Sequence, residues 1–107
     1  MAWKRIAAAA VAAGALWVAG PAGAQTPQDL NVRSLAATCA NCHGTQGQPV
    51  SGSTVPGLAG MPRDAMLASM KAFRDGTRPA TIMHQIAKGY SEAQLAQIAA
   101  YFAAQKK

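Results

Sequence analysis

The sequence is poor in acidic residues, in aromatic residues and in cysteine. Only four Asp and Glu residues stand against ten Lys and Arg residues, and aromatic residues make up 6% of the 107 residues. A nucleic-acid-binding surface normally shows clustered Lys and Arg residues with aromatic residues between them. No such cluster occurs here, so the composition excludes nucleic acid as the partner.

The sequence also lacks a strongly apolar run long enough to span a bilayer. Its N-terminal apolar run, residues 6–20, has 15 residues and is mostly alanine, whereas a membrane-spanning helix needs about 20 apolar residues. Lys4 and Arg5 precede this run and Ala22-Gly23-Ala24 follows it. This order of charge, apolar run and small residues is typical of a secretory signal peptide.

We therefore expect residues 1–24 to be a signal peptide that is cut before Gln25, and residues 25–107 to form one periplasmic domain. An uncleaved anchor is the alternative for the leader, and after cleavage no stable membrane insertion is expected. Processing removes two of the ten cationic residues. Eight then remain against four acidic residues, which gives a mildly basic domain of about +4.

A domain of this size needs cohesion beyond its apolar core. Small exported domains usually gain it from disulfides or from a metal. Here Cys39 and Cys42 are too close in the chain to join distant segments. Another group must therefore supply the missing stability.

Capping and turn signals divide residues 25–107 into short helices and one long loop, with no convincing strand. The first helix begins at Thr26 and Pro27 and runs into the cysteine motif, and the Gly-, Ser- and Pro-rich segment 44–60 is the loop. Three further helices are predicted: one opened by Pro62 and Asp64 and stopped by Asp75-Gly76, one from about Thr81 to Lys88, and one capped by Ser91 and Gln94.

Three of these helices carry an apolar stripe at helical spacing, which predicts the core of an all-α fold. The stripes are Val32, Leu35, Ala36 and Cys39; Met66, Leu67, Met70 and Phe73; and Leu95, Ile98, Ala99 and Phe102.

The segment Cys39-Ala40-Asn41-Cys42-His43 has the pattern of a covalent haem-attachment motif. Cysteines three residues apart lie on the same side of a helical turn, so both thiols can add to the two vinyl groups at one porphyrin edge. The next residue is then placed to direct its imidazole at the iron. We predict that Cys39 and Cys42 attach one haem c and that His43 is the proximal ligand.

Two other kinds of site contain such a cysteine pair. A tetrahedral zinc site needs two further ligands, and after His43 only one more histidine, His84, is present. A thioredoxin-like pair normally accompanies an alternating strand and helix pattern, which is missing. Haem is therefore favoured, and as a large apolar cofactor it would also complete the core.

A metal-bound imidazole usually donates its second N–H to an acceptor that fixes the ring. We expect a backbone carbonyl from the loop around Pro56-Gly57-Leu58 to accept from His43. The alternative is that Pro56 is an ordinary turn proline.

The second axial ligand is chosen among four methionines. Met66 and Met70 lie on a helix stripe, where methionine usually fills a core, and Met61 precedes a predicted helix start. Met83 comes 40 residues after the proximal histidine, which allows the chain to wrap the haem and return to its opposite face. We choose Met83, with a core methionine as the alternative. The adjacent His84 points about 100° away on a helix and is expected at the surface or behind the ligand.

Three segments carry a resemblance to a known family: residues 35–45, reading LAATCANCHGT, the turn 56–60, and residues 81–102, reading TIMHQIAKGYSEAQLAQIAAYF. Over nearly all of residues 25–107 the chain resembles the class I cytochrome c superfamily, and more narrowly the cytochrome subunit of flavocytochrome c sulfide dehydrogenase. The resemblance implies three to four helices around one haem, with the first helix crossing the last. It also implies thioethers at Cys39 and Cys42 and axial ligation by His43 and Met83.

The same resemblance implies a flavoprotein (FAD) partner that oxidises sulfide and passes electrons to this haem. The chain itself would then be an electron-transfer protein and not an enzyme. Two features depart from the subfamily: His84 stands where glycine is expected, and some members have two haem domains where this chain has one motif.

Two strong axial ligands leave no iron position for a substrate, so we expect electron transfer alone. The alternatives are a freely diffusing carrier that serves another dehydrogenase or oxidase, a gas-binding or peroxidase protein with an open sixth site, and a haem-free thiol protein. Five basic residues could surround an exposed haem edge and steer an acidic partner, or simply be solvated: Arg63, Lys71, Arg74, Arg78 and Lys88.

Overall fold

The computed structural model describes residue 20 and residues 22–107, so most of the expected signal peptide lies outside the described residues. Within them the structure contains no strand, and its elements are α1 (Pro27–His43), the 3₁₀ turn η1 (Thr45–Gly47), α2 (Arg63–Asp75), α3 (Met83–Lys88) and α4 (Glu92–Ala103). The all-α prediction is confirmed. No helix in this part of the chain is both long and apolar enough to cross a membrane.

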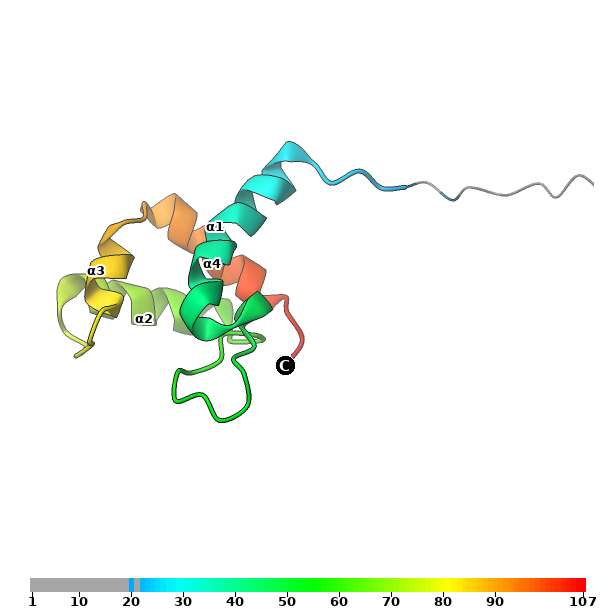
Figure 1. Ribbon diagram of the computed structural model, residues 1–107. Helices are drawn as coiled ribbons and strands as arrows, with labels where there is room; N and C mark the ends of the chain where they lie inside the picture. Colours follow the sequence, from blue (N-terminus) through cyan, green and yellow to red (C-terminus); the bar gives the residue numbers. More distant parts are fainter. Residues whose placement is uncertain (1–19, 21) are drawn as a thin grey trace, which may run out of the picture.

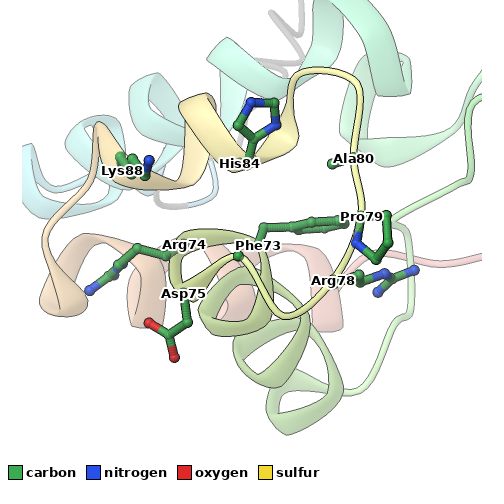
Figure 2. Close-up of a pocket in the computed structure, with 9 residues that line it drawn as sticks. Phe73, Arg74, Asp75, Arg78, Pro79, Ala80, His84 and Lys88 are labelled. Atoms are coloured by element: carbon green, nitrogen blue, oxygen red, sulfur yellow. The ribbon is translucent and has the colours of Figure 1, made fainter.

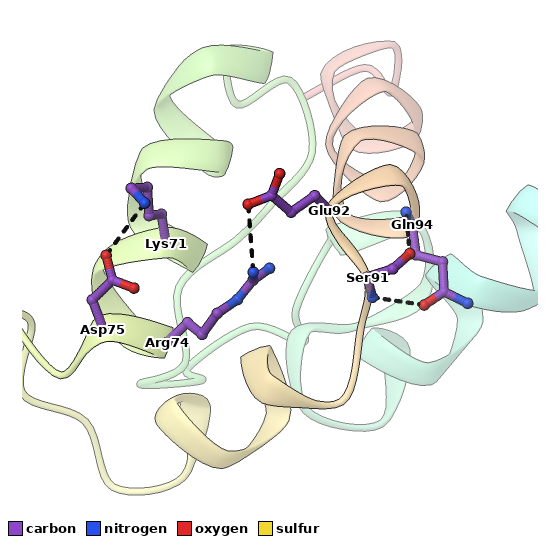
Figure 3. Close-up of polar contacts among 6 residues, drawn as sticks. All are labelled: Lys71, Arg74, Asp75, Ser91, Glu92 and Gln94. Atoms are coloured by element: carbon purple, nitrogen blue, oxygen red, sulfur yellow. Dashed lines mark hydrogen bonds and ion pairs between the residues drawn. The ribbon is translucent and has the colours of Figure 1, made fainter.

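Reciprocal caps begin the first and the last helix as the sequence predicts. The Ser91 hydroxyl accepts from the Gln94 backbone N–H at 3.1 Å, and the Gln94 side chain accepts from the Ser91 N–H at 2.9 Å (Figure 3). Thr26 and Asp29 form the same pair at the start of α1. Each pair satisfies two backbone donors that a helix start leaves without intrahelical partners.

Two local features differ from the sequence prediction. Helix α3 begins at Met83 and not near Thr81, because Ile82 has a non-helical backbone (φ −141°) and provides no side-chain cap. The predicted loop 44–60 also contains the short turn η1. The other boundaries agree closely, and α2 ends as expected at Gly76, whose positive φ of 76° closes the helix in the left-handed conformation.

The helices pack in the order α1, α4, α2, α3, and each contacts the next. Helix α1 crosses α4, and α2 contacts both α3 and α4 (Figure 1). Half of the buried core residues come from α4, and the α1 stripe is only partly covered, since Ala36 alone among its four members is buried. The buried hydrophobic residues are Ala36, Met66, Met70, Ala87, Leu95, Ile98, Ala99 and Phe102.

Candidate functional site

A cavity of about 490 Å³ opens beside the half-covered face of α1. Its walls include Cys39, Cys42 and His43 from α1 and Met83 from the start of α3, so all four predicted site residues lie around one space. The volume falls within the range of about 300–1,000 Å³ that is usual for cofactor pockets. Its apolar lining includes Leu58, Met61, Met66, Met70, Phe73, Ile86 and Ile98.

The His43 ring is fixed by the loop that faces it. Its Nδ1 atom lies 2.7 Å from the carbonyl oxygen of Pro56, which confirms the predicted backbone acceptor. Because a carbonyl can only accept, Nδ1 carries the hydrogen in this contact, and in the neutral imidazole Nε2 then keeps its lone pair. This is the tautomer that a metal-binding imidazole needs.

Gly47 holds the Pro56 loop against the end of α1. Its carbonyl accepts from the Leu58 N–H at 2.8 Å and from the Ala59 N–H at 3.1 Å. Its φ is +77°, and a Cβ atom here would lie 2.7 Å from the Ala59 nitrogen and 2.9 Å from the Leu58 Cβ. Only glycine fits this close approach without strain, so Gly47 indirectly sets where the Pro56 carbonyl stands.

The two cysteines of the motif lie in different environments. Cys39 is half-buried and Cys42 is exposed. Burial raises the pKa of the Cys39 thiol, an effect that the hydrogen bond with Thr38 only partly offsets. Redox-active cysteine pairs have a lowered pKa instead, so this environment disfavours the thiol-oxidoreductase alternative. In the described residues no three His, Cys, Asp or Glu side chains gather as a metal site.

All four methionines of the domain line the cavity. Met66 and Met70 are buried in the core, in keeping with their predicted packing role, whereas Met61 and Met83 are half-buried. Met83 as the second ligand therefore stays a prediction that rests on chain spacing, and Met61 is the other methionine with a partly uncovered side chain.

His84 lies in a different pocket from its neighbour Met83. This pocket, of about 320 Å³, lies between the end of α2 and α3 (Figure 2). His84 lines it together with Arg74, Arg78 and Lys88, and does not line the larger cavity. The separation follows from the angle of about 100° between consecutive residues on a helix.

The five basic residues named from the sequence do not form one ring around the cavity. Arg78 alone lines the larger cavity, and Arg63 and Lys71 line neither pocket. Three make ion pairs, Arg63 with Asp64 at 3.6 Å, Lys71 with Asp75 at 3.5 Å and Arg74 with Glu92 at 3.7 Å, the last two drawn in Figure 3. Such solvent-exposed pairs contribute little stability.

Thr38 and Tyr90 are among the cavity residues that the sequence did not single out. The Tyr90 hydroxyl, in the turn between α3 and α4, makes a short hydrogen bond with the Thr38 hydroxyl, next to Cys39 on α1. Both residues line the cavity. They are 52 positions apart, and no local pattern signals a contact that the tertiary fold creates.

The sequence of this chain matches a known protein family. The family model described as cytochrome c matches residues 31–106, so the chain belongs to the cytochrome c family, whose members are electron carriers with covalently bound haem c. The apolar cavity and the two cysteines beside His43 fit that cofactor.

Individual relatives support the same family. The chain is 40% identical to cytochrome c-554(548) of Halomonas halodenitrificans, over 64% of this chain and 86% of that protein. It is 37% identical to the cytochrome subunit of sulfide dehydrogenase of Chlorobaculum tepidum, over 64% of this chain and 60% of that one. It is 31% identical to the thiosulfate dehydrogenase electron acceptor of Thiomonas intermedia, over 92% of this chain but only 43% of that protein.

Among solved structures, the chain is similar to a cytochrome c4 of Acidithiobacillus ferrooxidans. The TM-score is 0.64 at 28% identity, and the match covers 77% of this chain and 52% of the other. The chain thus has the class I cytochrome fold, and the match spans about half the length of that relative.

Proposed function

We propose that this cytochrome is exported to the periplasm, holds one haem through Cys39 and Cys42 with His43 and Met83 as axial ligands, and accepts electrons from a sulfide-oxidising flavoprotein. The observation that carries the ligand assignment is the 2.7 Å contact from His43 Nδ1 to the Pro56 carbonyl. That contact leaves Nε2 free at the wall of a cavity that both cysteines also line.

When bound, the haem supplies an iron that cycles between Fe(II) and Fe(III). The chain's own residues set the conditions for that cycle. Pro56 holds the His43 tautomer, the apolar lining limits water, and a thioether from Met83 favours the reduced iron and so raises the potential. If His43 and Met83 both held the iron, no iron position would remain for a substrate.

The partner assignment is supported by what the relatives are. One is the cytochrome subunit of a sulfide dehydrogenase, and another is the electron acceptor of a thiosulfate dehydrogenase. Both names link a protein to a dehydrogenase of a reduced sulfur compound. The match to the thiosulfate dehydrogenase acceptor also supports a second candidate, a freely diffusing carrier that serves another dehydrogenase.

Carbon monoxide tests the axial ligands. We expect the reduced wild-type protein not to bind carbon monoxide rapidly, because Met83 occupies the sixth position, and we expect Met83→Ala to bind it. Met61→Ala is the matched control, since it removes the other half-buried methionine of the same cavity. If Met61→Ala opened the iron and Met83→Ala did not, the ligand assignment would be wrong.

Purification of the native protein tests export and partner together. An N-terminus at Gln25 would support cleavage of residues 1–24, and an intact leader would contradict it. Co-purification of an FAD-containing chain that reduces the haem when sulfide is added would support the flavoprotein partner. A protein that purifies alone and is not reduced by such a flavoprotein would favour the freely diffusing carrier.

A further inference from the structure

The smaller pocket, between the end of α2 and α3, has a basic lining to which the proposed electron transfer gives no role. Three positively charged residues line this space of about 320 Å³, Arg74, Arg78 and Lys88, together with the imidazole of His84. Asp75 is the only acidic residue among the described residues of the lining, which leaves an excess of two positive charges. A concave surface lined by one sign of charge attracts ions of the opposite sign. The pocket is therefore suited to an anion.

The acidic residue of the lining does not neutralise this charge. Asp75 points away from α3 (Figure 2), and its carboxylate pairs at 3.5 Å with Lys71, which lies outside the pocket. Figure 2 also shows Arg78 at the other end of the pocket from Arg74 and Lys88. Two basic side chains from facing helices therefore share one end of the pocket, and no carboxylate of the lining stands between them.

Arg74 has a buried donor that its neighbours leave unused. Its Nε atom is buried and has no hydrogen-bond partner in the part of the chain that the structure describes. Its Nη1 atom lies 3.7 Å from the Glu92 carboxylate, which is longer than a hydrogen bond of about 2.7–3.2 Å. An unsatisfied buried donor is unfavourable. A guanidinium binds oxyanions through two parallel hydrogen bonds, so an oxyanion in the pocket would satisfy the donor that Glu92 does not reach.

His84 supplies a second such atom on the opposite helix. Its Nδ1 is likewise buried and lacks a partner within residues 22–107. The neutral ring can carry its hydrogen on Nδ1 and donate it, so no change of protonation is needed. Lys88 follows four residues later on α3, and residues at this spacing share a helix face. The exposed ammonium of Lys88 belongs to none of the three ion pairs among the described residues. Both helices therefore offer donors to the same pocket.

We propose that this pocket binds a small tetrahedral oxyanion, of the class of phosphate and sulfate, between Arg74 of α2 and His84 and Lys88 of α3. Four oxygens in a tetrahedral arrangement accept from donors on both helices, whereas a carboxylate has only two oxygens in one plane. The bound anion bridges α2 and α3, which flank the segment 76–82. None of these three residues lines the larger cavity, so the proposal does not rest on the assigned haem ligands.

Titration of the purified protein in its reduced state with sodium phosphate, followed by the backbone amide NMR signals, tests the site. Sodium chloride is added in parallel at equal ionic strength, because screening acts on every surface charge. We expect phosphate to give saturable shifts centred on the end of α2 and on α3, and sulfate to give the same pattern. Shifts that do not saturate, that chloride or acetate reproduces, or that lie elsewhere would overturn the proposal.

Substitutions in the pocket locate the anion. We expect Arg74→Gln to weaken phosphate binding about tenfold, because charge-assisted hydrogen bonds are the strong ones, and Lys88→Gln and His84→Ala to weaken it by smaller factors. Arg63→Gln is the control of equal charge, since Arg63 also lies on α2 but lines neither pocket. It should change the dissociation constant by less than about twofold. An equal loss in Arg63→Gln would contradict the site, because the effect would then be one of general surface charge.

Glu92→Gln separates the loss of the site from the loss of an ion pair. Arg74→Gln also breaks the pair with Glu92, whereas Glu92→Gln breaks the same pair and keeps the guanidinium. We expect Glu92→Gln to bind phosphate at least as tightly as the wild type. Because a ligand that binds only the folded state stabilises it, phosphate should also raise the melting temperature of the wild type and of Glu92→Gln more than chloride does. Equal weakening in Glu92→Gln and Arg74→Gln would refute the role of Arg74.

Discussion

At the residue scale, the orientation of His43 depends on Pro56 and, through the Pro56 loop, on Gly47, which does not line the cavity. The imidazole is set by the Pro56 carbonyl, and the Pro56 loop is set by the Gly47 carbonyl. The glycine is required because its φ is positive and because no Cβ fits beside Ala59. A backbone change at Gly47 should therefore alter the orientation of the His43 imidazole, the proposed iron ligand.

Gly47→Ala tests this chain of contacts. We expect the substitution to destabilise the protein by about 1–3 kcal/mol through strained backbone and to loosen the His43–Pro56 hydrogen bond. Denaturant unfolding measures the first effect and the iron's ligand-field spectrum the second. Gly52→Ala is the control, since Gly52 also has a positive φ but has open space around it. Equal spectral changes in both variants would show that Gly47 does not position the loop.

Asp29 makes the stability of the protein depend on pH, again through a single residue. Hydrogen bonds from the Thr26 hydroxyl and then from the Thr26 backbone lower the pKa of Asp29 below its ordinary value of 3.8. A lowered folded pKa means that the contribution of Asp29 is fully present above pH 3.8 and is lost as the pH falls through the folded pKa. We expect the melting temperature of Asp29→Asn to fall less steeply than that of the wild type as the pH drops below about 4. An unchanged pH dependence in thermal unfolding would contradict a stabilising role of the Asp29 carboxylate in the cap.

At the scale of elements, α4 is the centre of the molecule. It supplies Leu95, Ile98, Ala99 and Phe102 to the core, and it packs against both α1 and α2. Its start depends on the Ser91–Gln94 pair. Loss of that cap should therefore lower the stability of the whole fold and not only fray one helix end.

Ser91→Ala should destabilise the protein by about 1 kcal/mol, which is typical for loss of a helix N-cap. The measurement is the free energy of unfolding in denaturant. Ser51→Ala, in the exposed loop 44–60, is the control and should change stability by less than about 0.5 kcal/mol. If the two variants were equally stable, the capping box would not contribute to α4.

The elements differ in how far the sequence predicts them. Caps such as Thr26 and Ser91 and the stop at Gly76 act within a few residues, so they could be read directly from the sequence. The start of α3 was misplaced because Ile82 carries no capping signal. Arg78 was expected only as one of five basic residues that surround an exposed haem edge or are solvated, and Tyr90 was given no role, since their places in the cavity wall depend on the packing of distant segments.

At the scale of the whole molecule, few side chains are buried for a chain of this length. A cavity lies beside the buried residues. Only eight described hydrophobic residues form the buried core, and half-buried residues such as Leu58, Met61 and Phe73 face the remaining space. Filling that space with a covalently bound haem removes their apolar surface from water. The cofactor is then part of the fold as well as the electron-carrying group.

The most direct test is the intact mass of the protein after export from a cell that attaches haem, followed by denaturation and alkylation of free thiols. We predict a mass equal to the polypeptide plus one haem, with neither Cys39 nor Cys42 alkylated. A colourless protein with the mass of the polypeptide alone and two alkylated cysteines would contradict the account.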